Sequence, residues 1–207
     1  MYSLLAIFLQ FVSGSVMYSY LLARLINVDL RKVGDGNPGS SNLWRAKGMK
    51  FGIIALTLDA FKGTFPLFLF IITDTVKDEY LIATAALFGI LGHAFSPMLR
   101  FNGGKAVATT FGAWTVLTKW EAPTILGTTF TIFTLLKPKG TTVEEDAFRV
   151  LLGFIALLPY VLYKLYSGQA HILLFYIGNL CIIGYKYWHD WVKFYKKCFM
   201  NKYSQNS

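Results

Sequence analysis

The chain has 207 residues, of which 55% are hydrophobic and 15% are charged, and its formal net charge at pH 7 is +9. This composition is too apolar for an ordinary soluble domain and is typical of a membrane protein. A helix that spans a bilayer needs about 20 mostly apolar residues, because its backbone must satisfy its own hydrogen bonds where water is absent.

Apolar segments follow one another along the chain and predict membrane-spanning helices. The two shorter segments are rich in Thr and Gly, so each of them could be a tilted or partly buried helix. We expect an all-α integral membrane protein, a single bundle of about seven transmembrane helices, with residues 1–207 forming one polytopic domain. The strong segments are 3–26, 51–73, 80–99, 148–166 and 170–188, and the shorter ones are 106–119 and 123–137.

The first predicted span begins almost at Met1, with no basic segment before it and no small-residue cleavage site. It lacks the features of a removable signal peptide, so we expect it to remain as a helix. Within it, Ser13-Gly14-Ser15 is a run of small residues that permits close packing against another helix.

The first connection reads GDGNPGSSNLWR over residues 34–45. Ser41 or Asn42 can cap a helix that begins at Leu43, and Arg45 lies one turn inside it. The exposed N–H groups of a helix start attract anions, and a guanidinium can hold a phosphate with two parallel hydrogen bonds. The segment therefore predicts an anion-binding helix entrance, with an ordinary Gly/Asn/Pro turn as the alternative.

Two charged residues interrupt the second predicted span. Asp59 and Lys62 are three residues apart, so they share one face of a helix. Charges within a membrane are costly unless they are paired or face a wet cavity. The pattern indicates either a structural ion pair or part of a functional site.

The third connection reads GHAFSPMLRFNGGKAVAT over residues 92–109. Asn102 can cap a helix whose first residues are Gly103 and Gly104, and Lys105 then places an ammonium beside the exposed N–H groups. This pattern predicts phosphate recognition, although it lacks the Walker A spacing. His93 lies near the end of its span, where an ionisable residue is a functional candidate. The alternatives are a plain capped loop and a structural hydrogen bond from the histidine.

Basic residues concentrate in alternate connections, and these connections are expected to be cytoplasmic. The connection at 74–79 is net acidic. With seven spans, the N-terminus lies outside and the C-terminus is cytoplasmic. The basic tail suits anionic lipid headgroups better than nucleic acid. The basic residues are Arg24, Arg31, Lys32, Arg45, Lys47 and Lys50; Arg100 and Lys105; and Lys186, Lys193, Lys196, Lys197 and Lys202.

Four of these segments together resemble, in order and spacing, the PlsY family, the bacterial glycerol-3-phosphate acyltransferases that use acyl-phosphate. The resemblance is specific over residues 10–112. In the second half, Leu151 stands where the family has a serine, and residues 189–192 retain only His189 of the family's H-R-x-N motif. The matching segments are Ser13–Ser15, Gly34–Arg45, Leu56–Gly63 and Gly92–Thr109.

The resemblance implies transfer of an acyl group from acyl-phosphate to the 1-hydroxyl of sn-glycerol 3-phosphate, giving lysophosphatidic acid and phosphate for phospholipid synthesis. It implies a bacterial inner membrane location with the active site facing the cytoplasm, membrane lipid as surroundings, no nucleic acid partner, and neither a metal nor another cofactor. His93 or the substrate phosphate could act as base. The resemblance implies His93 and Lys105 as catalytic residues, and Asn37, Ser40, Asn42, Arg45, Lys62, Gly103, Gly104, Lys105 and His189 as substrate-binding residues.

Two other classes of function stay open. A non-catalytic relative that binds acyl-phosphate or lipid would keep the phosphate-binding connections, and the altered third motif favours it. A small transporter would place polar residues at mid-membrane, whereas here most of them lie near the predicted cytoplasmic interface.

Overall fold

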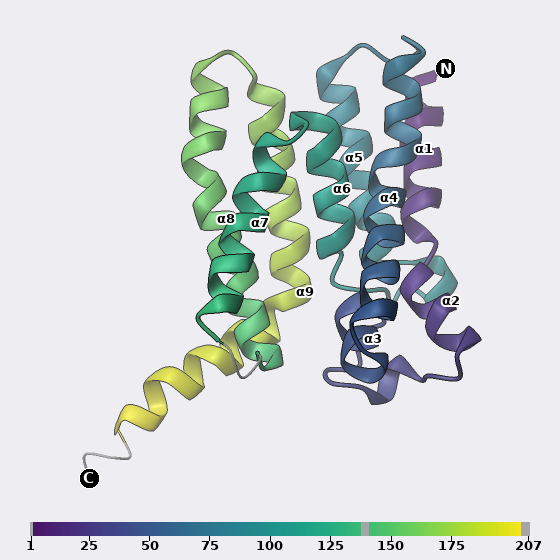
Figure 1. Ribbon diagram of the computed structural model, residues 1–207. Helices are drawn as coiled ribbons and strands as arrows, with labels where there is room; N and C mark the ends of the chain where they lie inside the picture. Colours follow the sequence, from purple (N-terminus) through teal and green to yellow (C-terminus); the bar gives the residue numbers. More distant parts are fainter. Residues whose placement is uncertain (1, 138–140, 204–207) are drawn as a thin grey trace.

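The computed structural model describes residues 2–137 and 141–203, and the regular structure within these ranges is helical, as expected. The long helices lie side by side as a bundle (Figure 1). In chain order the elements are α1 (Tyr2–Ser15), α2 (Tyr18–Leu25), the 3₁₀ turn η1 (Leu30–Lys32), α3 (Ser40–Lys47), α4 (Met49–Ile72), α5 (Glu79–Ala94), the 3₁₀ turn η2 (Pro97–Leu99), α6 (Val107–Thr118), α7 (Glu121–Leu135), α8 (Val143–Tyr166) and α9 (Ala170–Tyr203).

Four stretches in the described part of the chain are long and apolar enough to cross a membrane: Ser3–Leu25, Met49–Ile72, Glu79–Leu99 and Val143–Tyr166. Helix α6 is apolar but has only 12 residues. Large apolar side chains are exposed on the outside of the bundle, as a lipid solvent requires. The count of about seven spans and the direction of the termini stay predictions.

The first predicted span is broken into α1 and α2 at Val16 and Met17. The break frees two carbonyls from helical hydrogen bonding: Ser15 O accepts from Ser96 Oγ at 2.6 Å, and Val16 O accepts from Lys62 Nζ at 2.5 Å. The predicted span over 3–26 is thus found as Ser3–Leu25, but it is interrupted, because side chains from other elements satisfy the backbone groups that the helix releases.

Glycines bring α1 and α5 into close contact. A Cβ atom on Gly14 would lie 2.0 Å from the carbonyl oxygen of Gly89, and one on Gly92 would lie 2.2 Å from that of Phe11. The predicted role of Ser13-Gly14-Ser15 in close helix packing is confirmed at Gly14. This contact holds α1 against α5, and the end of α5 leads into the third connection.

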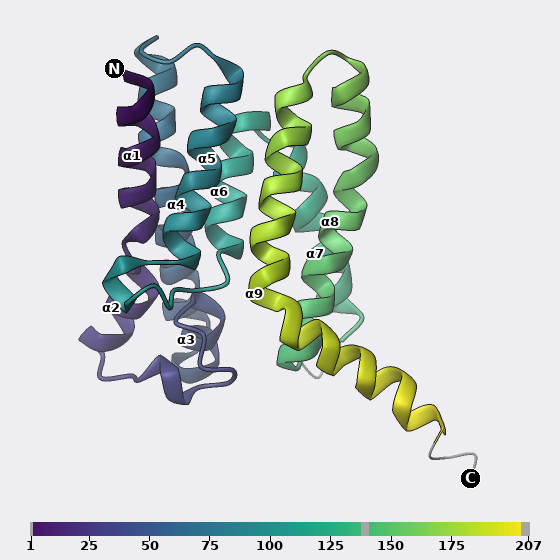
Figure 2. The ribbon, with the colours of Figure 1, turned by 180° about the vertical axis from the view of Figure 1, so that it is seen from behind.

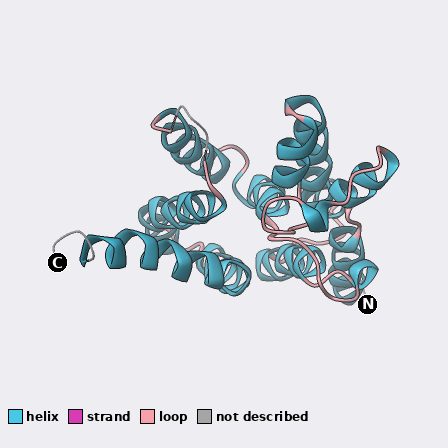
Figure 3. Cartoon of the chain, turned by 90° about the horizontal axis from the view of Figure 1, so that it is seen from below, coloured by secondary structure: helices cyan, strands magenta, loops and turns pink. Residues whose placement is uncertain are grey.

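The interior contains one large apolar cluster and one small one. The large cluster joins α4 through α9, with Trp114 packed edge-on against Phe175 at a centroid distance of 4.7 Å. The small cluster, Ala23, Leu30, Leu43 and Ala55, lies under the first connection and fixes α3 against α4. Figures 2 and 3 show the helices of the bundle from behind and from below.

The connections predicted to be cytoplasmic gather at one end of the bundle. Residues 26–48 and 95–106 lie at the bottom of Figure 1, where α8 begins and the far end of α9 emerges. The acidic connection at 73–78 and the turn between α8 and α9 lie at the opposite end. The chain thus brings its two glycine-containing connections together although about 60 residues separate them.

Candidate active site

The first connection forms a short helix that begins earlier than predicted. Helix α3 starts at Ser40 with Gly39 as its N-cap, so neither Ser41 nor Asn42 caps it. Asn42 is instead buried inside the helix, and its amide donates to the carbonyls of Val33 at 2.8 Å and Asn37 at 3.0 Å. The prediction of a cap was wrong because this side chain closes the preceding loop.

Arg45 lies on the same short helix, and its guanidinium donates hydrogen bonds to two side chains. Its Nη1 donates to Asn42 Oδ1 at 3.0 Å, and its Nη2 is paired with Asp146 from the start of α8. The Arg45 side chain is 30% exposed, so part of the guanidinium remains accessible. Asp146, which lies in an acidic helix start, was not predicted as a site residue.

The third connection does not begin a helix at Gly103. Helix α6 starts at Val107, and its N-cap is Ala106, a non-glycine residue in the left-handed region with φ 59°. The N–H of Gly104 donates to the carbonyl of His93 at 3.1 Å, which holds the glycines as an extended segment against the end of α5. The predicted cap by Asn102 was therefore wrong, and Lys105 lies two residues before the helix.

Arg31 joins the first connection to the third. Its Nη1 donates to Gly36 O at 3.2 Å, and its Nη2 donates to Asn102 O at 2.5 Å. In the sequence, Arg31 was only one of the basic residues that indicate a cytoplasmic connection, because its contact with Asn102, 71 residues away, follows no local pattern.

Lys105 lies between two carboxylates. Its Nζ is 2.5 Å from Asp35 Oδ2 of the first connection and 2.5 Å from Asp190 Oδ2 of α9, and it lies 4.5 Å from the centre of the Tyr187 ring. Burial raises the pKa of Asp35, but hydrogen bonds and charge from Lys105 and Asn42 outweigh it, so this pKa lies below its ordinary value. We call Lys105, Asp35 and Asp190 the rim cluster.

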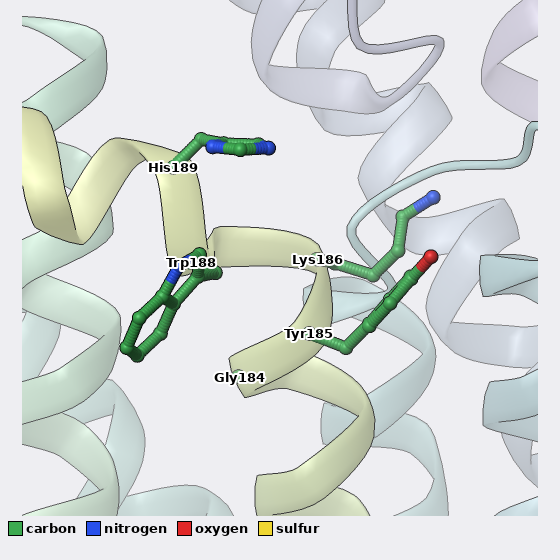
Figure 4. A pocket seen from close by; sticks show the side chains of 5 residues that line it. All are labelled: Gly184, Tyr185, Lys186, Trp188 and His189. Carbon is green, nitrogen blue, oxygen red and sulfur yellow. The ribbon is translucent and has the colours of Figure 1, made fainter.

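A second lysine, Lys186 of α9, reaches the glycine segment, Gly103-Gly104. Lys186 Nζ donates to the carbonyls of Ala94 at 3.1 Å and Gly103 at 3.2 Å. Lys186 and His189 both line an open cavity of about 470 Å³, together with Gly184, Tyr185 and Trp188 (Figure 4). The cavity therefore adjoins the glycine segment, and His189 faces it from α9.

His93 and Lys62 lie deeper in the bundle. His93 is 3% exposed, its Nδ1 is 3.2 Å from Thr109 Oγ1, and its Nε2 is packed against the backbone of Gly104. Lys62 Nζ is 2.9 Å from Asp59 Oδ1, and both side chains are 1% exposed. We call Lys62 and Asp59 the inner pair. Their burial favours structural support of the site, while catalysis by His93 and substrate binding by Lys62 stay predictions.

The structure thus brings most of the predicted residues to one end of the bundle. Asn37 and Ser40 lie beside Asn42 and Arg45 in the first connection, and Gly103 and Gly104 lie between His93 and Lys105. It adds the carboxylates Asp35, Asp146 and Asp190 and the cations Arg31 and Lys186. Among residues 2–137 and 141–203, no three His, Cys, Asp or Glu side chains are grouped to hold a metal ion.

Comparison with known protein families gives one consistent match. A family model described as glycerol-3-phosphate acyltransferase matches residues 4–197. Glycerol-3-phosphate acyltransferase 1 of Thermotoga maritima is 56% identical over 184 residues, which are 86% of this chain and 91% of that protein. Glycerol-3-phosphate acyltransferase 2 of the same organism is 35% identical and covers 83% of this chain and 85% of its own.

Solved structures give the same match. The crystal structure of PlsY, an integral membrane glycerol 3-phosphate acyltransferase, in its glycerol 3-phosphate form, superposes with a TM-score of 0.75 at 25% identity and covers 92% of this chain and 90% of its own. The similarity extends well beyond residues 10–112, so the second half of the chain follows the same fold despite its altered motifs.

Proposed function

The chain belongs to the glycerol-3-phosphate acyltransferase family, and we propose from this premise that it transfers an acyl group from acyl-phosphate to the 1-hydroxyl of sn-glycerol 3-phosphate. The products are lysophosphatidic acid and inorganic phosphate. The observation that supports the proposal is a cluster of cations around the first and third connections: Arg31 and Lys186 donate to the carbonyls of Asn102 and Gly103, Lys105 follows Gly104, and Arg45 lies on the short helix of the first connection.

This arrangement suits two substrates that both carry phosphate. Lys105 and Arg45 have accessible ammonium and guanidinium groups, which form strong charge-assisted hydrogen bonds with phosphate oxygens. Asn37 and Ser40, which are partly exposed, and the backbone of Gly103 and Gly104 are the proposed contacts for the substrates, while the buried Asn42 holds the loop that carries Asn37. The cations would hold the two phosphates while the hydroxyl of one substrate lies against the carbonyl carbon of the other.

The chemistry needs little from the protein beyond positioning and charge. The hydroxyl oxygen forms a bond to the acyl carbon, and the bond between that carbon and the phosphate oxygen breaks, so phosphate leaves. The hydroxyl proton passes to the departing phosphate or to His93, which stands behind Gly104. Cations beside the leaving phosphate stabilise its growing charge. No covalent acyl-enzyme is required.

Carboxylates within the protein compete with the substrates for these cations. Lys105 is shared between Asp35 and Asp190, and Arg45 is paired with Asp146. Two of the three N–H groups of Lys105 face these carboxylates, so a phosphate binds the third or takes the place of a carboxylate. We infer that Asp35 and Asp190 orient the lysine while they weaken its binding of phosphate.

An assay of the purified protein tests the proposal. The full chain, in detergent or lipid, receives palmitoyl-phosphate and glycerol 3-phosphate, and release of phosphate and formation of lysophosphatidic acid are measured. We expect both products, and no reaction when palmitoyl-coenzyme A replaces palmitoyl-phosphate. Turnover with the coenzyme A ester alone would overturn the donor assignment. Binding without turnover would favour the non-catalytic relative, a reading supported by Leu151 at the family's serine position.

The proposed location is the bacterial inner membrane with the site facing the cytoplasm. The support is the gathering of the basic connections at the same end of the bundle as the rim cluster. A reporter fused after residue 205 should read cytoplasmic, and one inserted beside Lys77 should read external. Reporters that read the same side would refute this topology.

A further inference from the structure

The far end of α9 leaves the bundle. Helix α9 runs from Ala170 to Tyr203, about 51 Å at a rise of 1.5 Å per residue, which exceeds the roughly 30 Å of a bilayer's hydrocarbon core. Figures 1 and 2 show its last turns projecting sideways from the end of the bundle at which the rim cluster lies. Part of this helix therefore lies outside the hydrocarbon region.

One face of this projecting part is fixed against α8. Trp191 Nε1 donates to the carbonyl of Ala147 at 2.7 Å, and the Phe194 ring stacks on Phe148 at a centroid distance of 4.5 Å. These contacts hold the helix at the angle at which it leaves the bundle. Its direction is therefore set by packing rather than by a free hinge.

The other faces carry aromatic and basic side chains. Trp188 and Tyr195, seven residues apart and so on one stripe of the helix, are 62% and 61% exposed. Lys193, Lys196 and Lys197 are exposed, with Lys196 about a quarter turn around the helix from this stripe and Lys193 and Lys197 on the opposite face. Exposed Trp and Tyr on one face of a helix and lysines on the other are typical of a helix that lies in the headgroup region of a membrane.

We propose that residues 188–198 of α9 form an interfacial segment that docks on the anionic headgroups of the bilayer around the bundle. The aromatic rings enter the boundary between headgroups and acyl chains, and the lysines, on the polar side of the helix, stay at the level of the headgroups and attract the lipid phosphates. Glu144 and Glu145 at the start of α8 lie within electrostatic range of these lysines, Glu144 of Lys193 and Lys197 and Glu145 of Lys197, but two carboxylates do not neutralise three ammonium groups. This inference does not depend on the proposed acyltransferase activity.

Docking is measured directly with a probe on this segment. Cys198 and Cys181 are both exposed, so a Cys181→Ala chain is labelled at Cys198 with an environment-sensitive fluorophore. The labelled protein is placed in nanodiscs of phosphatidylcholine, or of equal parts phosphatidylcholine and phosphatidylglycerol. We expect a blue-shifted, quencher-protected signal in the anionic discs that high salt reverses, because ions screen headgroup charge.

A triple variant, Lys193→Gln/Lys196→Gln/Lys197→Gln, isolates the charge. Each lysine near an anionic surface contributes roughly fivefold to binding, so the triple variant should weaken docking on the order of a hundredfold and lose the blue shift. The matched control, Lys32→Gln/Lys77→Gln/Lys119→Gln, removes equal charge from other surfaces and should leave the signal unchanged. An identical signal in neutral and anionic discs, or in the triple variant and the parent, would overturn the proposal.

Discussion

The inner pair and the rim cluster are both built from lysine and carboxylate, yet they differ in access to solvent. The side chains of Lys62 and Asp59 are 1% exposed, whereas those of Lys105, Asp35 and Asp190 are 13%, 17% and 12% exposed. A sealed pair cannot exchange partners, and breaking it leaves a buried charge. A cluster with access to water can release a carboxylate and accept a phosphate. Burial, more than residue type, therefore separates support from binding.

The largest effect is expected at the inner pair. Lys62→Met leaves Asp59 without its partner inside the bundle, at a cost of about 3–5 kcal/mol in the free energy of unfolding. Thermal stability in a fixed detergent should fall sharply. The double variant Lys62→Met/Asp59→Leu removes both charges and should recover much of this loss. A stable Lys62→Met protein with a raised KM would instead place Lys62 among the substrate-binding residues.

In contrast to Lys62→Met, Lys105→Ala should change the activity of the protein much more than its stability. The side chain is partly exposed, so the fold should survive with a modest change in Tm. Loss of its charge-assisted bonds to phosphate should lower kcat/KM on the order of a hundredfold. Steady-state kinetics with each substrate varied in turn give the measurement. If the folded variant has the kcat/KM of the parent protein, Lys105 does not bind phosphate and the rim cluster has only a structural role.

Arg45 sharpens the comparison because it tests geometry and charge separately. Lysine keeps the charge but lacks the planar fork that holds two oxygens. Arg45→Lys should therefore lower kcat/KM for glycerol 3-phosphate roughly tenfold, the loss of one charge-assisted bond of about 1.5 kcal/mol. Arg45→Ala should lower it further. If lysine matches arginine while alanine does not, charge alone suffices and the two-bond model is wrong.

The smallest effect is expected at Asp190, where a substitution should strengthen the binding of phosphate and not weaken it. Asp190→Asn removes one of the carboxylates that compete for Lys105, so inorganic phosphate should inhibit the enzyme several-fold more strongly, a change of about 1 kcal/mol. Inhibition constants for phosphate provide the test. Asp29→Asn, an exposed carboxylate paired with Lys32, serves as the control for charge. Weaker inhibition in Asp190→Asn would show that this carboxylate assists phosphate binding.

Much of the site was predictable because its signals are local. Glycines, a capping pattern and a nearby Lys or Arg identified residues 34–45 and 92–109 as phosphate-binding candidates. Both predicted helix starts were wrong, since Asn42 closes a loop and Gly104 bonds to His93 instead of entering a helix. A helix start predicted from sequence assumes that the polar groups bond within the new helix, whereas here Asn42 bonds to the loop before α3 and Gly104 bonds to the end of α5.

Apolar run length and residue type determined the helical membrane architecture, since a bilayer imposes the same requirement on every segment that crosses it. Only the tertiary structure decided which charges meet. Lys105 and Asp190 are 85 residues apart, and Arg45 and Asp146 are 101 apart. No local pattern encodes such pairs, because they depend on how α3, α8 and α9 pack at one end of the bundle. The same packing sealed Lys62 inside and left Lys105 at the rim, which the sequence alone presents as two similar lysines.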